Sequence, residues 1–166
     1  MRRNWSGPEM TFERSALFGP TFLILALLLS PAHATVVEEM SVAELAGDAV
    51  RVVHARVMDQ YVVAERGPQG QIYTRTRLEV LSNLKGDGTT QVTVQQLGGL
   101  YGDQLLTVSG NAEFTIGTEV VVFLDHDGES GLSYVVGLSQ GLFRVHHTTH
   151  LSWVDRHLHG LAFYRV

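Results

Sequence analysis

Residues 72–80 read Ile-Tyr-Thr-Arg-Thr-Arg-Leu-Glu-Val, and this stretch decides the fold class. Apolar or small polar side chains at the even-numbered positions alternate with Tyr, Arg, Arg and Glu at the odd-numbered ones. A period of two over the whole stretch is incompatible with a helix, whose apolar positions recur every three or four residues. The stretch therefore predicts a long central β-strand with one buried face, which includes Leu78, and one exposed face, which includes Arg77.

Other stretches of β-branched and apolar residues, separated by glycine-rich turns, predict further strands. They lie at 50–63 (with a bulge after Met58), 91–95, 105–108, 119–124, 132–136, 143–145 and 151–154, and the strand at 72–80 extends to Leu84. Ser41 and Glu44 form a capping-box pattern ahead of a short helix. Many short strands with almost no helix are typical of a barrel or a sandwich. Of these we expect an all-β, OB-like, partly open barrel of about 6–8 strands with one short N-terminal helix.

The strand expected at 119–124 differs from the others, because it is apolar at every position after Glu119. Such a run is typical of a strand that is covered on both faces.

The N-terminal residues have the pattern of a secretory signal peptide. Three arginines precede an apolar run at 22–29, and Ala32-His33-Ala34 matches the A-x-A cleavage pattern. The apolar run is much shorter than the roughly 20 residues that a membrane-spanning helix requires. We therefore expect a signal peptide at 1–34, with translation starting at Met1 or Met10, and a single exported domain at 35–166. The expected location is periplasmic or extracellular.

Charge and cysteine content narrow the function classes. The first 34 residues carry three of the 12 basic and two of the 17 acidic residues, so the remaining 132 have a formal charge of −6. Such a chain lacks the basic surface that nucleic-acid binding requires. It has no cysteine, which excludes thiol chemistry and leaves stability to the core. We expect no cofactor, no nucleic acid and no membrane contact after cleavage, and an unknown protein or extracellular ligand as the partner.

The order of the predicted helix and strands along the chain resembles that of known protein families. A short helix is followed by Val-Val-His-Ala-Arg-Val at 52–57, by the strand that ends in Lys85-Gly86, and by Phe-Thr-Ile-Gly at 114–117 ahead of the apolar strand. Over about 41–145 the chain resembles a group of exported bacterial β-rich proteins of unassigned function. It is more distantly similar to the OB-type barrels of netrin-like and metalloproteinase-inhibitor domains. The resemblance implies a barrel that binds rather than catalyses. Inhibitors of that kind reach the protease zinc through an N-terminal cysteine, which this chain lacks, so their mechanism is not implied.

Residues 137–141, Gly-Leu-Ser-Gln-Gly, match the G-x-S-x-G pattern of serine hydrolases. Asp155 and His157 follow Ser139 in the chain order of an α/β-hydrolase triad. That chemistry needs a strand-to-helix turn above a parallel sheet, whereas 142–145 reads as a strand and the crossover helices are missing. We interpret the glycines as a turn and expect no enzyme, with a hydrolase using Ser139, Asp155 and His157 as the alternative.

Histidines are concentrated near the C-terminus. His146, His150, His157 and His159 lie where a hairpin would bring them together as imidazole ligands for zinc, copper or nickel. A solvated turn and tail explains the same residues. We expect no specific metal binding by these four histidines, and we keep a metal site as a further alternative.

The glycine-containing turn at 67–70 joins the strands expected at 50–63 and 72–84 into a first hairpin. The exposed side of this hairpin offers the candidate binding residues, Tyr61, Tyr73, Arg75 and Arg77. Barrels of this type often bind ligands on such a face. A solvated face in which Arg77 and Glu79 have cross-strand partners explains the residues as well. The expected function is an exported binding or interaction module.

Overall fold

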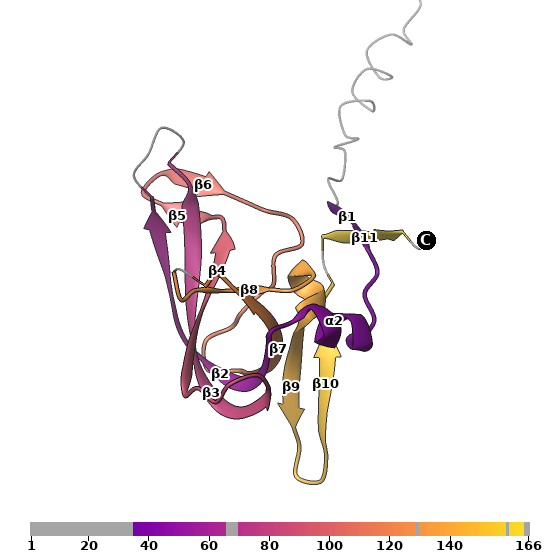
Figure 1. Cartoon of the computed structure of the whole chain (residues 1–166). Helices are drawn as coiled ribbons and strands as arrows, with labels where there is room; N and C mark the ends of the chain where they lie inside the picture. Colours follow the sequence, from indigo (N-terminus) through magenta and orange to yellow (C-terminus); the bar gives the residue numbers. More distant parts are fainter. Residues whose placement is uncertain (1–34, 66–69, 129, 159, 165–166) are drawn as a thin grey trace, which may run out of the picture. The chain divides into compact units, whose positions relative to one another are not determined.

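The computed structural model describes residues 35–65, 70–128, 130–158 and 160–164. The expected signal peptide, most of the first hairpin turn and His159 lie outside the described residues. In chain order, the elements are β1 (Thr35–Glu38), α2 (Val42–Asp48), β2 (Arg51–Ala64), β3 (Ile72–Lys85), β4 (Gln91–Leu97), β5 (Gly99–Tyr101), β6 (Gln104–Leu106), β7 (Glu119–His126), β8 (Ser133–Val135), the 3-10 helix η1 (Leu138–Gly141), β9 (Leu142–His147), β10 (Ser152–Arg156) and β11 (Leu161–Tyr164) (Figure 1). No helix in the described ranges is long and apolar enough to span a bilayer.

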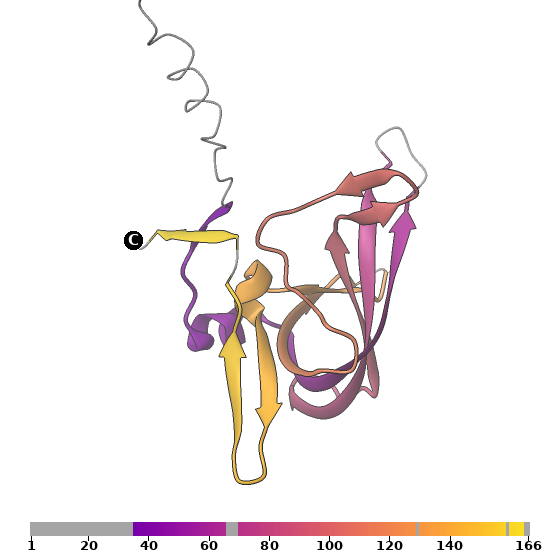
Figure 2. The same ribbon diagram turned by 180° about the vertical axis from the view of Figure 1, so that it is seen from behind.

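The main sheet has seven strands in the order β10-β9-β7-β2-β3-β4-β8, and β8 also pairs with β7. Strands β7, β2, β3, β4 and β8 therefore close a ring. The contact between β4 and β8 is parallel and consists of one residue pair, Val94 with Ser133, whereas the other pairs of the ring are antiparallel. A ring closed by one short contact is a partly open, OB-like barrel, which confirms the predicted fold. Strands β9 and β10 continue the sheet beyond β7 as a hairpin (Figure 2).

The alternation predicted for 72–80 is confirmed in β3. Ile72, Thr76 and Leu78 are at most 6% exposed, whereas Arg77 and Glu79 are exposed. A register shift against β3 between Val57 and Asp59 gives β2 the expected bulge, and β2 runs through it as one strand.

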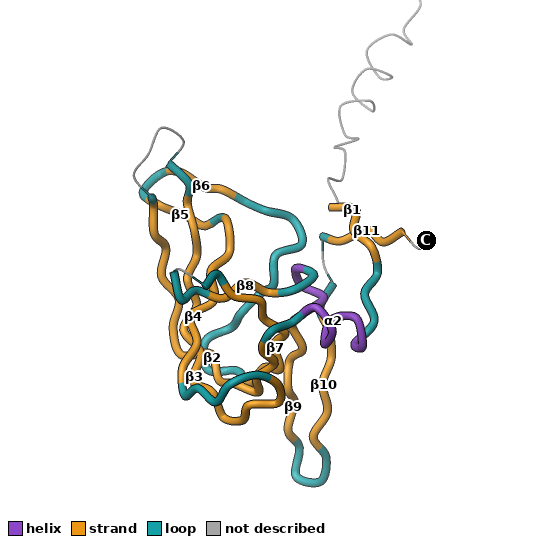
Figure 3. Tube along the Cα trace, in the orientation of Figure 1, coloured by secondary structure: helices purple, strands orange, loops and turns teal. Residues whose placement is uncertain are grey.

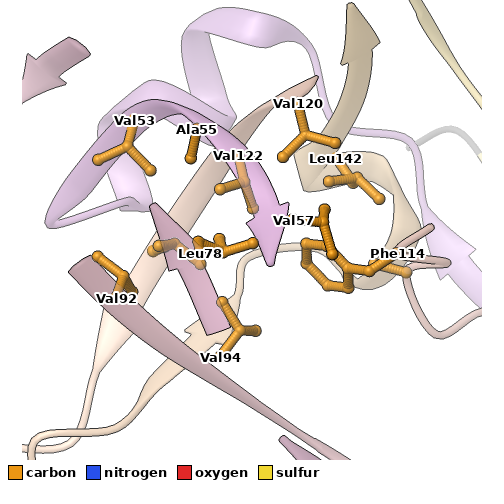
Figure 4. Close-up of a cluster of buried hydrophobic side chains, with 12 residues drawn as sticks. Val53, Ala55, Val57, Leu78, Val92, Val94, Phe114, Val120, Val122 and Leu142 are labelled. Atoms are coloured by element: carbon orange, nitrogen blue, oxygen red, sulfur yellow. The ribbon is translucent and has the colours of Figure 1, made fainter. Parts of the chain in front are cut away.

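The interior of the ring holds the larger core. It is made of apolar side chains from β2, β3, β4 and β7, from the start of β9 and from the connection between β6 and β7, and the partly buried Val135 of β8 packs against it (Figure 4). These residues are Val53, Ala55, Val57, Leu78, Val92, Val94, Ala112, Phe114, Val120, Val122, Leu124 and Leu142. The connection that supplies Ala112 and Phe114 has no regular helix or strand (Figure 3).

A second, smaller core lies on the outer side of the sheet, under α2. Leu45 from α2 is fully buried and packs with Val52 of β2 and Phe123 of β7. Because Val122 and Leu124 face the larger core, β7 is covered on both sides, as its sequence predicts.

The helix itself begins with the predicted capping box. The Ser41 amide donates to Glu44 Oε2 at 2.7 Å, and the Glu44 amide donates to Ser41 Oγ at 3.2 Å. At the other end, Lys85 Nζ donates to the carbonyl oxygens of Ala46 and Ala49 at 2.6 and 2.5 Å. A cation at the C-terminus satisfies carbonyls that have no partner within the helix.

Two parts of the fold differ from the prediction. The strand expected at 105–108 is β6, which is shorter and pairs with β5 in the segment where glycines were expected to break the chain. Gly99 enters β5 with φ +138°, and a Cβ there would lie 2.7 Å from Thr74 Oγ1, so the close approach of the backbone requires glycine. Strands β1 and β11 form an unpredicted parallel pair, because two four-residue segments far apart in sequence leave little local pattern.

Candidate functional sites

The four predicted binding residues share the outer face of β2 and β3. Strand register places Tyr61 opposite Arg75, and the alternation of β3 puts Tyr73, Arg75 and Arg77 on one side. The structure therefore brings the predicted residues together, and it adds one that the sequence did not identify. Tyr134 of β8 reaches the same face, where its hydroxyl lies 3.5 Å from Gln95 Nε2.

Both arginines of this face are held in place. Arg75 Nε donates to Gln95 Oε1 at 2.8 Å, and Arg77 Nε donates to both oxygens of Asp59, at 2.8 and 3.0 Å. The partner of Arg77 is thus Asp59, which lies directly opposite on β2, as expected for a cross-strand partner. The hydrogen bond from Arg77 lowers the pKa of Asp59.

The aromatic rings of the face remain accessible. Tyr61 is 41% and Tyr134 is 38% exposed, while Tyr73 is half-buried. Burial raises the pKa of Tyr73, and the negative charges of Glu65 and of an ionised Tyr134 raise it further. We call Tyr61, Tyr73, Arg75, Arg77 and Tyr134 the tyrosine face.

A second polar cluster lies on the outer side of β2, β7 and β9. Because Val53, Ala55 and Val57 point into the core, His54 and Arg56 point outward, and register places Arg56 opposite Glu119. Glu119 Oε1 accepts from Arg56 NH2 at 2.8 Å. Its other oxygen, Oε2, lies 2.9 Å from His54 Nε2 and 3.0 Å from His147 Nε2.

Glu119 is the centre of this cluster. Its side chain is 19% exposed, against 26% for His54 and 53% for His147. The pKa of Glu119 is lowered to about 2, and the main cause is the hydrogen bond from Arg56. His147 and His54 lower this pKa further, whereas burial alone would raise it. Among the residues that the structure describes, His54, Glu119 and His147 are the one group of three that could hold a metal ion, with ligand atoms within 4.8 Å of one another.

The sequence did not point to this cluster. His147 was the one histidine of 146–150 left out of the predicted quartet, and His54 and Glu119 lie 65 residues apart. The alternation of β2 shows that His54 points outward, but its partners depend on which strand lies beside it.

The predicted histidine quartet is distributed differently. His146 Nε2 lies 2.9 Å from Asp155 Oδ1, and its ring stacks on Trp153 with centroids 4.0 Å apart. His157 Nδ1 lies 3.1 Å from Arg144 NH1, and His150 is exposed in the turn after β9. Within the described ranges, these histidines form no group of three ligands.

Ser139 lies in η1, directly before β9. Gly137 has φ +67° and the strand that follows begins at Leu142, so the predicted glycine turn and strand are present. Ser139 is 3% exposed, and its Oγ has no hydrogen-bond partner among the residues that the structure describes. Asp155, the acid of the alternative triad, contacts His146.

Comparison with known proteins adds no identity: no family model, no curated protein and no solved structure matches the chain. The resemblance to exported β-rich proteins and to netrin-like domains therefore stays a prediction.

Proposed function

We propose that the chain is an exported binding module that holds a protein partner on the tyrosine face. The observation that carries the proposal is the gathering of three tyrosines and two arginines on one outer face of an OB-like barrel. Tyrosine and arginine are among the residue types that contribute most to binding at protein interfaces. Barrels of this type also bind ligands on an exposed face of neighbouring strands.

The hydrogen bonds of the face favour binding. Gln95 holds Arg75 and Asp59 holds Arg77, so both guanidinium groups are oriented before a partner arrives. Side chains that are already ordered lose less conformational entropy on association. Tyrosine rings add contact area at a small entropic cost, since each has only two side-chain torsions.

The location is part of the proposal. The pattern of residues 1–34 supports export, and the proposed partner is therefore a protein of the periplasm or of the exterior.

The test is recovery of a partner by the tagged protein from the exported fraction of its own host. Tyr61→Ala and Tyr164→Ala are matched variants, because each removes one tyrosine of similar exposure, 41% and 49%, and only Tyr61 belongs to the tyrosine face. We expect wild type and Tyr164→Ala to recover the same amount of partner per amount of tagged protein. Tyr61→Ala should weaken binding about thirtyfold, which corresponds to about 2 kcal/mol.

A partner recovered equally by both variants, or lost equally from both, would contradict the proposal. Tyr134→Ala provides an independent check, since it removes another ring of the same face from a different strand.

A further inference from the structure

We propose that His54, Glu119 and His147 form a binding site for a divalent transition metal ion, with zinc as the probe. The three side chains come from neighbouring strands, β2, β7 and β9, and their ligand atoms face one another. Two imidazoles and one carboxylate are a donor set that zinc accepts. This inference does not depend on the proposed function, because the tyrosine face shares none of these residues.

The distances between the donor atoms fit a metal. Two ligands at zinc–nitrogen and zinc–oxygen distances of about 2.0–2.1 Å in a tetrahedral site lie roughly 3.3 Å apart. Glu119 Oε2 lies 2.9 Å from His54 Nε2 and 3.0 Å from His147 Nε2. An ion that replaces these two shared hydrogen bonds would therefore need only small movements of the three side chains.

The surroundings orient two of the ligands. Arg56 holds Glu119 Oε1 at 2.8 Å, so the carboxylate would bind through Oε2 alone. His147 Nδ1 lies 2.8 Å from Ser152 Oγ, and a donor bond from this nitrogen leaves Nε2 as the metal-binding atom. The positive charge of Arg56 opposes a dication, so we expect a moderate affinity, in the micromolar range.

The site is open to solvent on one side. His147 is 53% exposed, whereas His54 and Glu119 are held against the sheet. Zinc can enter from that side, and three protein ligands leave the fourth tetrahedral position to water.

A bound ion would connect the ring to the hairpin beyond it. His54 and Glu119 belong to ring strands, whereas His147 lies on β9, which continues the sheet outside the ring. Because the unfolded chain does not hold the three ligands together, zinc should stabilise the folded state by mass action.

The experiment uses protein purified from cells that express the full chain, with the processing that the host performs, after removal of metal with a chelator. Calorimetric titration with zinc chloride should give one equivalent. At a hundredfold excess of free zinc over Kd, the Tm should rise by roughly 10 °C.

Variants assign the ligands. His147→Ala should abolish the one-equivalent binding and the Tm rise, and Ser152→Ala should weaken binding about tenfold or more. The matched control is His150→Ala/His157→Ala, which removes two histidines of the same region that lie outside the cluster and should bind zinc like wild type. Glu119→Gln is the second ligand variant, and circular dichroism checks that each variant is folded.

Three results would overturn the proposal. The first is that the wild type shows no saturable zinc binding. The second is that both His147→Ala and Glu119→Gln are folded and still bind zinc. The third is that the double variant His150→Ala/His157→Ala loses zinc binding while His147→Ala retains it. The last result would assign zinc to the C-terminal histidines instead.

Discussion

Among single residues, Glu119 has the most polar partners in the two candidate sites. Its carboxylate accepts from one arginine and contacts two histidines, on β2 and β9, and these contacts hold it in the ionised form. The pKa of about 2, against an ordinary value of 4.5, means that the folded chain binds fewer protons at this group than the unfolded chain. The free energy of unfolding must therefore depend on pH between about 2 and 4.5.

We predict that Glu119→Gln flattens the acid side of the stability profile. The contribution of Glu119 is complete above its unfolded pKa of about 4.5 and is lost as the pH falls towards about 2, so the wild type should lose Tm steeply there. The glutamine variant lacks this titration, and its Tm should be lower at pH 7 but fall less between pH 4.5 and 2. Thermal unfolding followed across this range in the presence of a chelator measures both slopes. Parallel curves for the two proteins would contradict the prediction.

Among the elements, β3 shows how a sequence pattern with a period of two residues determines which side chains pack in the core. Leu78 is 1% exposed inside the ring, and its neighbour Arg77 points outward to Asp59. Adjacent residues on one strand therefore have opposite environments, and a change of register by one residue would exchange them.

We predict that Leu78→Asp unfolds the domain, whereas Arg77→Ser does not. Burying an unpaired carboxylate costs several kcal/mol, a large part of the stability of a domain of this size. Loss of the exposed ion pair with Asp59 should cost little stability, because solvent screens the attraction between exposed charges. Thermal unfolding of the two variants makes the comparison, and equal Tm values would mean that the strand faces are assigned wrongly.

At the scale of the whole molecule, long-range pairs complete the fold. Ring closure depends on β8, which meets β7 along three residue pairs and β4 through one. The N-terminal strand depends on the C-terminal one, since β1 pairs with β11 from Thr35 onward. Cleavage after Ala34 would leave this pairing intact.

We predict that the released protein begins at Thr35. Ala32-His33-Ala34 matches the A-x-A pattern after which signal peptides are cleaved. The new N-terminal residue is already placed by its strand pairing and by a hydrogen bond from Thr35 Oγ1 to the Ser109 carbonyl at 2.9 Å. Mass spectrometry of the intact protein from the exported fraction measures the start, and a product that retains 22–29 would contradict export by this route.

The sequence alone determined the features that depend on neighbours within a few residues. The alternation of 72–80 placed Leu78 inside and Arg77 outside, and Ser41 with Glu44 marked the start of α2. These predictions succeed because side-chain direction on a strand and the capping of a helix are local properties.

The tertiary structure alone decided which distant residues meet. The β4–β8 contact, the pairing of Arg77 with Asp59 and the meeting of Glu119 with His54 and His147 join residues that no local pattern relates. Strand order and register set these contacts, and both result from packing one core across the whole chain. The partners of the histidines also depend on the tertiary structure. His146 and His147 are adjacent in sequence, but the pleat of β9 directs them to opposite faces and to different partners.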